Sequence, residues 1–402
     1  MSDPLAKPLT TPSAEDGRYF PRQDRIKKIE TFLVKPRWLF LKMTTEEGIV
    51  GLGEPLLEGR SLTCQTAVQE LEPWLIGEDP TRVVHLWQSM YKHTFYRGGE
   101  ILTSALSGVE QALWDCYGKL LGLPVYRLLG GPTRERVRVY GTAGGRDPES
   151  AAQSVREAVA LGFNAIKTGP ARGGRRGRLI ETAGYTERVV ETFAAMREAA
   201  GPEVDIAIDF HGAVPPATAK RLVKALEPYH PFFIEEPVQC QNVDVLADIT
   251  HSTSVPIATG ERLFTKWGFR EVLEKRAATI LQPDLSHAGG IMETRLIAGM
   301  AEAYYAGLAP HCPLGPIAFA ACVQLDAAIP NFLCQEGGRH TTPALDGYLK
   351  VPFRHEGGYL PLPTGPGLGI ELDEESLAAK DLIGHDWQNP KSYAEDGSAI
   401  DW

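Results

Sequence analysis

The stretch Ile206-Ala207-Ile208-Asp209-Phe210-His211 begins a pattern that recurs in Phe233-Ile234-Glu235 and in Ile257-Ala258-Thr259-Gly260-Glu261. Each copy is a short apolar run followed by a carboxylate, and the carboxylates at 209, 235 and 261 are 26 residues apart. That interval accommodates one strand, one helix and their turns, which is typical of a parallel sheet with helical crossovers. The pattern predicts that Asp209, Glu235 and Glu261 end adjacent parallel strands.

Similar segments extend the pattern in both directions. The strand candidates are 137–140, 165–167, 206–209, 232–235, 257–260, 279–282, 307–310 and 332–335, and helical stretches between them are 149–161, 186–199, 216–226 and 293–306. Eight strands with helical crossovers in about 200 residues favour a (β/α)-barrel of the TIM type, over residues 136–347. A doubly wound open sheet is the alternative, although such sheets usually have fewer strands in this length.

The segments on either side of the barrel have a different composition. Residues 29–34, 38–44 and 49–54 are strand-like, and residues 104–120 form the clearest helix of this region. Strands followed by helices predict an α+β capping domain over residues 25–135. We expect residues 1–24 to be a flexible tail and the Gly- and Pro-rich residues 348–402 to pack back on the capping domain.

Composition restricts the class of protein. A hydrophobic content of 43% and a charged content of 23% are ordinary for a globular protein. The net charge of −10 argues against a nucleic-acid partner. The six cysteines show no metal-type spacing, and the sequence has neither a signal peptide nor an apolar run long enough to span a membrane. These features predict a soluble cytoplasmic protein with reduced thiols.

The three carboxylates predict a metal site. In a barrel they would meet at the C-terminal rim, where active sites lie. Three converging carboxylates repel one another unless a cation neutralises them, and hard oxygen ligands suit Mg²⁺. Any one of these acids alone would more often be a loop residue or a helix cap.

Other ionisable residues follow neighbouring strand candidates. Asp284 follows strand six, His311 strand seven and Glu336 strand eight, while His211 lies two residues after Asp209. An Asp beside a His predicts a pair in which the carboxylate orients the imidazole and increases its basicity. His287 has two open interpretations, a loop-stabilising residue or a substrate contact.

The sequence resembles the enolase superfamily, in its mandelate-racemase-like branch, and within that branch the galactonate dehydratases. The resemblance covers the chain from about residue 26 to 402. The segments that carry it are Pro36-Arg37-Trp38, Gly51-Leu52-Gly53-Glu54-Pro55, Phe95-Tyr96-Arg97-Gly98-Gly99, Gln111-Ala112-Leu113-Trp114-Asp115, Asp209-Phe210-His211-Gly212, Phe233-Ile234-Glu235-Glu236-Pro237, residues 280–290 and residues 308–316.

The resemblance implies the roles of these residues. It implies Mg²⁺ on Asp209, Glu235 and Glu261, a small sugar-acid substrate and a homo-oligomer. It implies that His211 removes the proton α to the carboxylate and that His311, paired with Asp284, protonates the departing 3-hydroxyl. Glu336 would hydrogen-bond the substrate carboxylate, for which we expect a protonated side chain with a raised pKa.

One segment separates this chain from racemases and muconate cyclisers, which carry Lys-x-Lys at the end of strand two. Here the segment is Lys167-Thr168-Gly169, without the second lysine, as in galactonate dehydratases. The Arg-rich loop 170–182 differs from these relatives, and its run Gly173–Gly177 does not fit a phosphate-binding fingerprint. We expect dehydration of D-galactonate. Dehydration of another aldonate, such as gluconate or mannonate, and a non-catalytic sugar-acid binding protein remain as alternatives.

Overall fold

The computed structural model describes residues 24–170, 181–394 and 396–401. The loop with Arg172, Arg175, Arg176 and Arg178 therefore lies outside the described residues, as does nearly all of the predicted N-terminal tail. None of the helices in these ranges is long and apolar enough to cross a membrane.

The N-terminal region is an antiparallel sheet covered by helices. The strands are β1 (Ile26–Val34), β2 (Trp38–Thr45) and β3 (Val50–Gly53), in the order β1-β2-β3. The helices are α1 (Ser61–Leu71), α2 (Val83–Lys92), α3 (Glu100–Leu121) and α4 (Val125–Leu128), with a 3₁₀ turn, η1, at Glu72–Trp74. Helix α3 lies so close to β3 that a Cβ on Gly53 would be 1.9 Å from the carbonyl oxygen of Gly108. This contact requires glycine at position 53.

The second region is a curled parallel sheet. Within the described residues its strands follow the order β10-β9-β8-β7-β6-β5-β4-β11. They are β4 (Arg136–Thr142), β5 (Ala165–Thr168), β6 (Asp205–Asp209), β7 (Ile234–Glu235), β8 (Ile257–Thr259), β9 (Ile280–Leu281), β10 (Gly307–Leu308) and β11 (Gln335–Glu336). A parallel bridge joins Leu308 of β10 to Phe332, three residues before β11, and so brings the two ends of this order together. The predicted barrel architecture is confirmed, and the open-sheet alternative is wrong.

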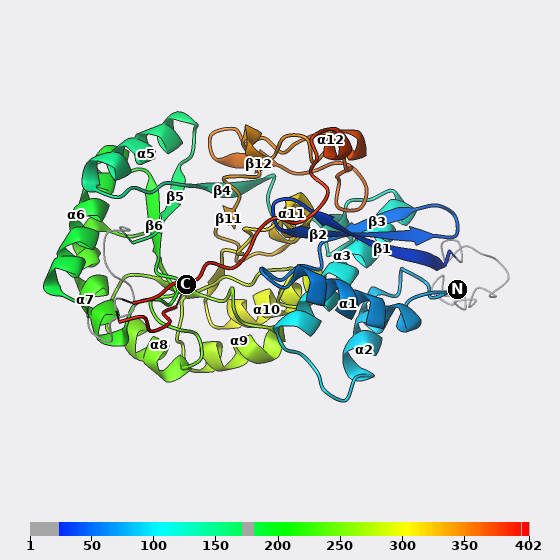
Figure 1. The fold of residues 1–402 in the computed structure, drawn as a ribbon, viewed down its shortest axis with the longest axis horizontal. Helices are drawn as coiled ribbons and strands as arrows, with labels where there is room; N and C mark the ends of the chain where they lie inside the picture. Colours follow the sequence, from blue (N-terminus) through cyan, green and yellow to red (C-terminus); the bar gives the residue numbers. More distant parts are fainter. Residues whose placement is uncertain (1–23, 171–180, 395, 402) are drawn as a thin grey trace, which may run out of the picture.

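Helices connect successive strands of the barrel and cover its outside (Figure 1). They are α5 (Pro148–Ala160), α6 (Ala183–Ala200), α7 (Pro216–Leu226) with the 3₁₀ turn η2 (Glu227–Tyr229), α8 (Val243–Thr250), α9 (Thr265–Glu274), α10 (Gly290–Ala303) and α11 (Pro316–Ala328). The last parallel strand, β11, is followed by the 3₁₀ turn η3 (Pro343–Leu345) in place of a helix. The chain then forms β12 (Tyr359–Pro361), which pairs antiparallel with β4. The barrel is thus modified at its last unit.

Helix α10 begins three residues before the predicted start at 293. Its first turn contains Gly290, a poor helix former, so the sequence pattern favoured a later start. The structure supplies the missing cap from another part of the chain, because the Glu110 carboxylate on α3 accepts hydrogen bonds from the backbone N–H groups of Ile291 and Met292. This cap also fixes the N-terminal region against the barrel.

The C-terminal segment, which includes α12 (Glu374–Ala379), lies beside the N-terminal sheet (Figure 1). Backbone hydrogen bonds join Lys35 N to Leu382 O at 2.7 Å and Gly384 N to Leu33 O at 2.9 Å. The Tyr348 hydroxyl donates to Lys35 O at 3.0 Å. These bonds hold the segment against the N-terminal sheet.

Candidate active site

The carboxylates of Asp209, Glu235 and Glu261 converge at the C-terminal end of the barrel strands. Each offers an oxygen within 4.8 Å of the others. Asp209 and Glu235 are paired in register as the last residues of β6 and β7. Glu261 lies two residues beyond the end of β8, which corrects the expectation that all three stand at the same position of their strands.

Gly260 allows the chain to bring Glu261 back to the other two carboxylates. Its φ is +149°, and a Cβ at this position would lie 2.7 Å from the backbone nitrogen of Gln282 on the neighbouring strand. A larger residue would push the two strands apart. The glycine therefore serves the geometry of the carboxylate cluster.

These carboxylates fit a divalent cation. Asp209 Oδ2, Glu235 Oε2 and Glu261 Oε2 are buried, and none of them accepts a hydrogen bond from any residue that the structure describes. Buried acceptors are usually satisfied, so three that are not, in one place, indicate a missing positive partner. Burial, followed by the neighbouring Asp209 carboxylate, raises the pKa of Glu235, as expected for a ligand set without its cation.

Lys167 on β5 supplies part of the positive charge of the site. Its ammonium nitrogen is 3.0 Å from Glu235 Oε1 and 3.5 Å from both Asp209 Oδ2 and Glu336 Oε1. Burial alone would lower the pKa of Lys167, but these carboxylates outweigh it and raise the pKa well above its usual value. The sequence did not identify Lys167 as a site residue. Its segment was informative only because it lacks the second lysine of the Lys-x-Lys pattern.

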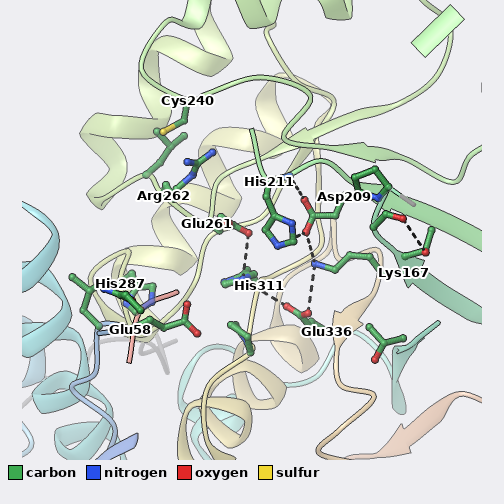
Figure 2. A pocket seen from close by; sticks show the side chains of 18 of the residues that line it. Glu58, Lys167, Asp209, His211, Cys240, Glu261, Arg262, His287, His311 and Glu336 are labelled. Atoms are coloured by element: carbon green, nitrogen blue, oxygen red, sulfur yellow. Dashed lines mark hydrogen bonds and ion pairs between the residues drawn. The ribbon is translucent and has the colours of Figure 1, made fainter. Parts of the chain in front are cut away.

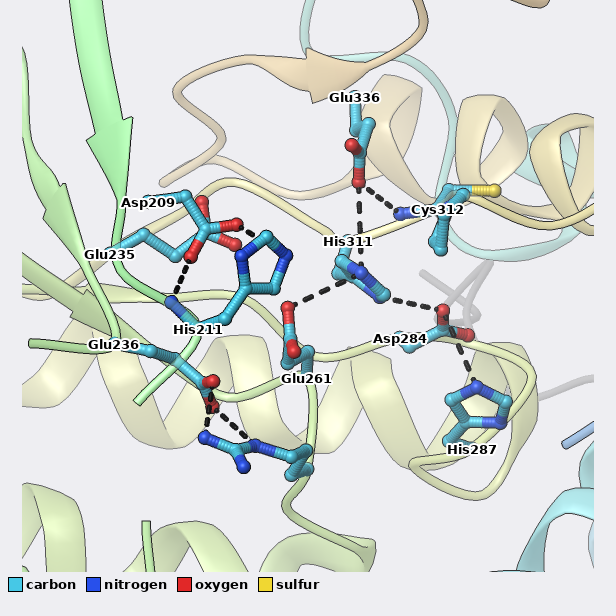
Figure 3. Close-up of polar contacts among 12 residues, drawn as sticks. Asp209, His211, Glu235, Glu236, Glu261, Asp284, His287, His311, Cys312 and Glu336 are labelled. Carbon is cyan, nitrogen blue, oxygen red and sulfur yellow. Dashed lines mark hydrogen bonds and ion pairs between the residues drawn. The ribbon is translucent and has the colours of Figure 1, made fainter. Parts of the chain in front are cut away.

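His211 stands beside the carboxylate cluster at the cavity mouth. Its Nε2 is 3.1 Å from Asp209 Oδ2, and its side chain is 55% exposed. The backbone has a left-handed φ of 50°, and its N–H donates to Asp209 Oδ1 at 2.8 Å. A left-handed non-glycine residue is held by its surroundings. Here the backbone hydrogen bond to Asp209 holds the main chain of His211, and the imidazole lies against the other oxygen of the same carboxylate (Figure 3).

His311 and Asp284 form the predicted pair. His311 Nδ1 is 3.0 Å from Asp284 Oδ2, and His311 Nε2 is 3.3 Å from Glu261 Oε2. Burial would lower the pKa of His311, but Glu261 and the hydrogen bond to Asp284 raise it well above its usual value. Figure 3 shows His311 between the carboxylate cluster and Asp284.

Glu336 faces the same space, but its charge state differs from the expectation. Burial would raise the pKa of Glu336, yet Lys167 and His311, together with the N–H of Cys312 at 2.9 Å, lower it to about 2. The expected raised pKa is therefore wrong for this arrangement of side chains. The sequence could not show this, because Lys167 and His311 come from other strands.

Two further residues were not identified from the sequence as neighbours of the site. The buried Glu236 side chain accepts a hydrogen bond from Arg262 Nε at 3.0 Å, and Arg262 Nη1 donates to Gln239 at 2.7 Å. The charges of Glu236 and Arg262 thus compensate each other next to the metal ligands. In the sequence Glu236 is visible only as the second of two consecutive glutamates, Glu235-Glu236. Their order does not tell which of the two faces the barrel interior.

A cavity of about 1150 Å³ lies over this site (Figure 2), and the site residues that line it are Lys167, Asp209, His211, Glu261, Arg262, His311 and Glu336. Its walls come from the barrel, from the N-terminal residues Arg37, Glu58 and Arg60, and from Asn389 of the C-terminal segment. Arg37 Nη2 and Glu58 Oε1 form an ion pair at 2.6 Å on this wall. The cavity thus combines an acidic, metal-competent floor with a polar cover.

The chain matches two family profiles and curated relatives that it covers over their full length. The profile described as "Mandelate racemase / muconate lactonizing enzyme, N-terminal domain" matches residues 27–130, and "Enolase C-terminal domain-like" matches residues 150–376. Proteins named D-galactonate dehydratase from Ralstonia nicotianae and Cronobacter sakazakii are 45% and 44% identical, over 94% of this chain and 100% of theirs.

Solved structures share the fold. An enolase from Agrobacterium radiobacter, with bound Na and L-malate, superposes with a TM-score of 0.87 at 31% identity, covering 94% of this chain and 99% of that one. A member of the enolase superfamily from Salmonella Typhimurium gives a TM-score of 0.84 at 31% identity, covering 88% and 98%.

Proposed function

The chain belongs to the enolase superfamily, and from this premise we propose that it dehydrates a sugar acid, D-galactonate, to 2-dehydro-3-deoxy-D-galactonate with the help of Mg²⁺. It is a hydro-lyase, like the dehydratases that match it over their full length. The observation that carries the proposal is the cluster of three carboxylates beside two histidines, in which each carboxylate has a buried oxygen without a hydrogen bond from the described residues.

Asp209, Glu235 and Glu261 would hold the cation. When bound, Mg²⁺ supplies positive charge beside the substrate carboxylate, where negative charge develops as the α-proton leaves. Lys167 adds a fixed ammonium next to the same cluster. Such preorganised charge matters because the proton α to a carboxylate is a very weak acid.

The contacts favour His311 as the base that takes the C2 proton. Asp284 accepts from Nδ1, which keeps that proton in place. Glu261 is the largest cause of the raised pKa of His311, so a cation held by Glu261 would lower that pKa and leave Nε2 as the proton acceptor facing the cavity. His211 is half exposed, so it can take up protons from solvent and deliver one to the departing 3-hydroxyl. This division reverses the roles that the family resemblance implied for the two histidines.

The reaction balances with these groups alone. The C2–H bond breaks, the proton goes to His311, the C3–O bond breaks, and the hydroxyl leaves as water with the proton from His211. The resulting enol tautomerises to the 2-keto-3-deoxy acid. Glu336 accepts a hydrogen bond from Cys312 N and forms an ion pair with Lys167. Because it also lies 3.9 Å from His311 Nε2, it would position the part of the substrate that faces His311.

A substrate screen tests the reaction. Purified protein with Mg²⁺ is incubated with a panel of aldonic and aldaric acids, and the 2-keto acid product is measured. We expect turnover of D-galactonate that chelator abolishes. Turnover of another acid only would contradict the assigned substrate, and binding without turnover of any acid would favour a sugar-acid binding protein.

Solvent exchange at C2 tests the roles of the histidines. In D₂O, His211→Asn should still exchange the C2 hydrogen while losing dehydration, and His311→Asn should lose both, each by about 10²–10⁴-fold in rate. The reverse result would restore the roles implied by the family resemblance. Binding of Mg²⁺ to both variants, measured by calorimetry, shows that each site is still assembled.

A further inference from the structure

His287 lines the active-site cavity but has no part in the proposed proton transfers. It lies in the loop between β9 and α10 and is only 5% exposed. Its Nδ1 is 3.0 Å from the Ser104 hydroxyl on α3, so one face of the ring contacts the N-terminal region. A buried polar side chain at a cavity wall needs a partner for its other nitrogen.

The Ser104 hydroxyl determines which ring nitrogen of His287 carries the proton. Ser104 Oγ is 2.6 Å from the carbonyl oxygen of Glu100, and because a carbonyl cannot donate, the hydroxyl must donate its only proton there. The hydroxyl can then only accept from the imidazole, so Nδ1 of His287 carries the hydrogen. In the neutral ring, Nε2 is consequently an acceptor with a free lone pair.

Among the residues that the structure describes, none is recorded as a donor to that lone pair. The recorded contact of His287 Nε2 is with Asp284 Oδ2 at 3.8 Å, which is too long for a hydrogen bond. This oxygen is itself an acceptor, and it already takes a hydrogen bond from His311 Nδ1. Nε2 therefore requires a donor from the cavity.

The position of His287 indicates which part of a substrate supplies the donor. Figures 2 and 3 both place His311 between His287 and Asp209. A sugar acid with its carboxylate at the metal ligands and its C2–C3 bond beside His311 would extend its remaining carbons towards His287. The polar groups on those carbons are hydroxyls, which are donors.

We propose that His287 is a specificity residue whose Nε2 accepts a hydrogen bond from a substrate hydroxyl beyond C3. The inference rests on the proposed function and deepens it, because it selects acids with a polyol tail. A second carboxylate at that place would offer only acceptors to Nε2 and would lie close to the charge of Asp284. The site thus favours aldonic over aldaric acids.

His287→Asn is the sharpest test, because the asparagine amide can still donate to Ser104 Oγ while the Nε2 acceptor is deleted. Two probes are compared in the presence of Mg²⁺: D-galactonate as substrate, and 2,3-dihydroxybutanoate, which lacks hydroxyls beyond C3, as a competitive inhibitor. We expect kcat/KM for galactonate to fall about 10-fold or more, as for a buried hydroxyl left without its partner. The inhibition constant of the short acid should stay within about twofold.

Ser104→Ala is the matched control for a merely structural role. It breaks the contact between α3 and His287 but keeps the imidazole, so we expect a smaller loss with galactonate than in His287→Asn. Equal losses for both probes in His287→Asn, a larger loss in Ser104→Ala, or no loss at all would overturn the inference. Failure of the parent protein to dehydrate any sugar acid would instead overturn the proposed function, and that is measured before any variant.

Discussion

The polar side chains in the two halves of the barrel rim differ in how their hydrogen-bonding groups are satisfied. In the carboxylate half, formed by Asp209, Glu235 and Glu261, each residue has a buried oxygen without a hydrogen bond from the described residues. In the histidine half, formed by Asp284, His311 and Glu336, hydrogen bonds hold the side chains: Asp284 accepts from Ser286 N at 2.7 Å and from His311 at 3.0 Å. One half is built for an added cation, and the other fixes a proton-transfer group with the protein's own bonds.

Glu235→Gln should break the carboxylate half alone, with the largest effect. It removes the central negative ligand, so we expect Mg²⁺ affinity to fall by more than the 10–100-fold typical of changes outside the ligand sphere, and turnover to be lost. Calorimetry with Mg²⁺ and product formation measure the two effects. Glu271→Gln makes the same charge change on the surface and should change neither. Unchanged Mg²⁺ affinity in Glu235→Gln would contradict the ligand assignment.

Asp284→Asn should break the histidine half alone. The asparagine no longer anchors the Nδ1 proton of His311, and we expect kcat to fall by about 10²–10⁴-fold, the range for a lost acid–base group. Mg²⁺ affinity should stay close to that of the parent, since Asp284 is not a ligand. A variant that loses Mg²⁺ and keeps kcat at saturating metal would show that the two halves are not separate.

Lys167→Met tests how the carboxylate half is stabilised before it binds metal. Removing the buried ammonium leaves close carboxylates uncompensated, so we expect the free energy of unfolding in chelator to fall by about 3–5 kcal/mol. Mg²⁺ should restore a large part of it. Lys350→Met, which removes an exposed ion pair with Glu371, should have little effect in either condition. The same loss with and without Mg²⁺ would contradict this role.

Glu54 extends the comparison to a buried carboxylate outside both halves, where the expected effect is on stability and not on catalysis. Burial raises its pKa from 4.5 to about 8, although the N–H groups of Ala318 and Gly315 lower it. The folded protein binds this proton more tightly than the unfolded chain, so the contribution to stability is full below pH 4.5 and is lost as the pH rises to about 8.

Glu54→Gln stays neutral, so its stability relative to the parent should increase with pH across this window, by at most about 1.4 kcal/mol per pH unit. Denaturant unfolding at several pH values from about 5 to 8 measures the difference. A difference that does not change with pH would contradict the raised pKa.

The sequence predicted residues at the ends of strands better than residues inside strands or contacts between regions. Asp209, His211 and Glu235 were identified because an apolar run ends beside each of them. Lys167 was missed as a member of the site because it lies inside β5, and the face to which a strand residue points depends on the sheet register.

Long-range hydrogen bonds account for the remaining differences. The start of α10 depends on Glu110, which is 181 residues before Ile291, and no local pattern contains that cap. The charge of Glu336 likewise depends on Lys167 and His311 from other strands. Local sequence patterns therefore locate the rim residues, while their charge states and partners follow only from the assembled barrel.

The most direct test of the central claim is a Mg²⁺ titration of the metal-free protein, in which binding and D-galactonate turnover are measured on the same sample. We predict one Mg²⁺ site per chain in the parent, turnover that rises in proportion to its occupancy, and neither signal in Glu235→Gln. Turnover at full rate in chelator, or a Mg²⁺ site that survives Glu235→Gln unchanged, would contradict the account.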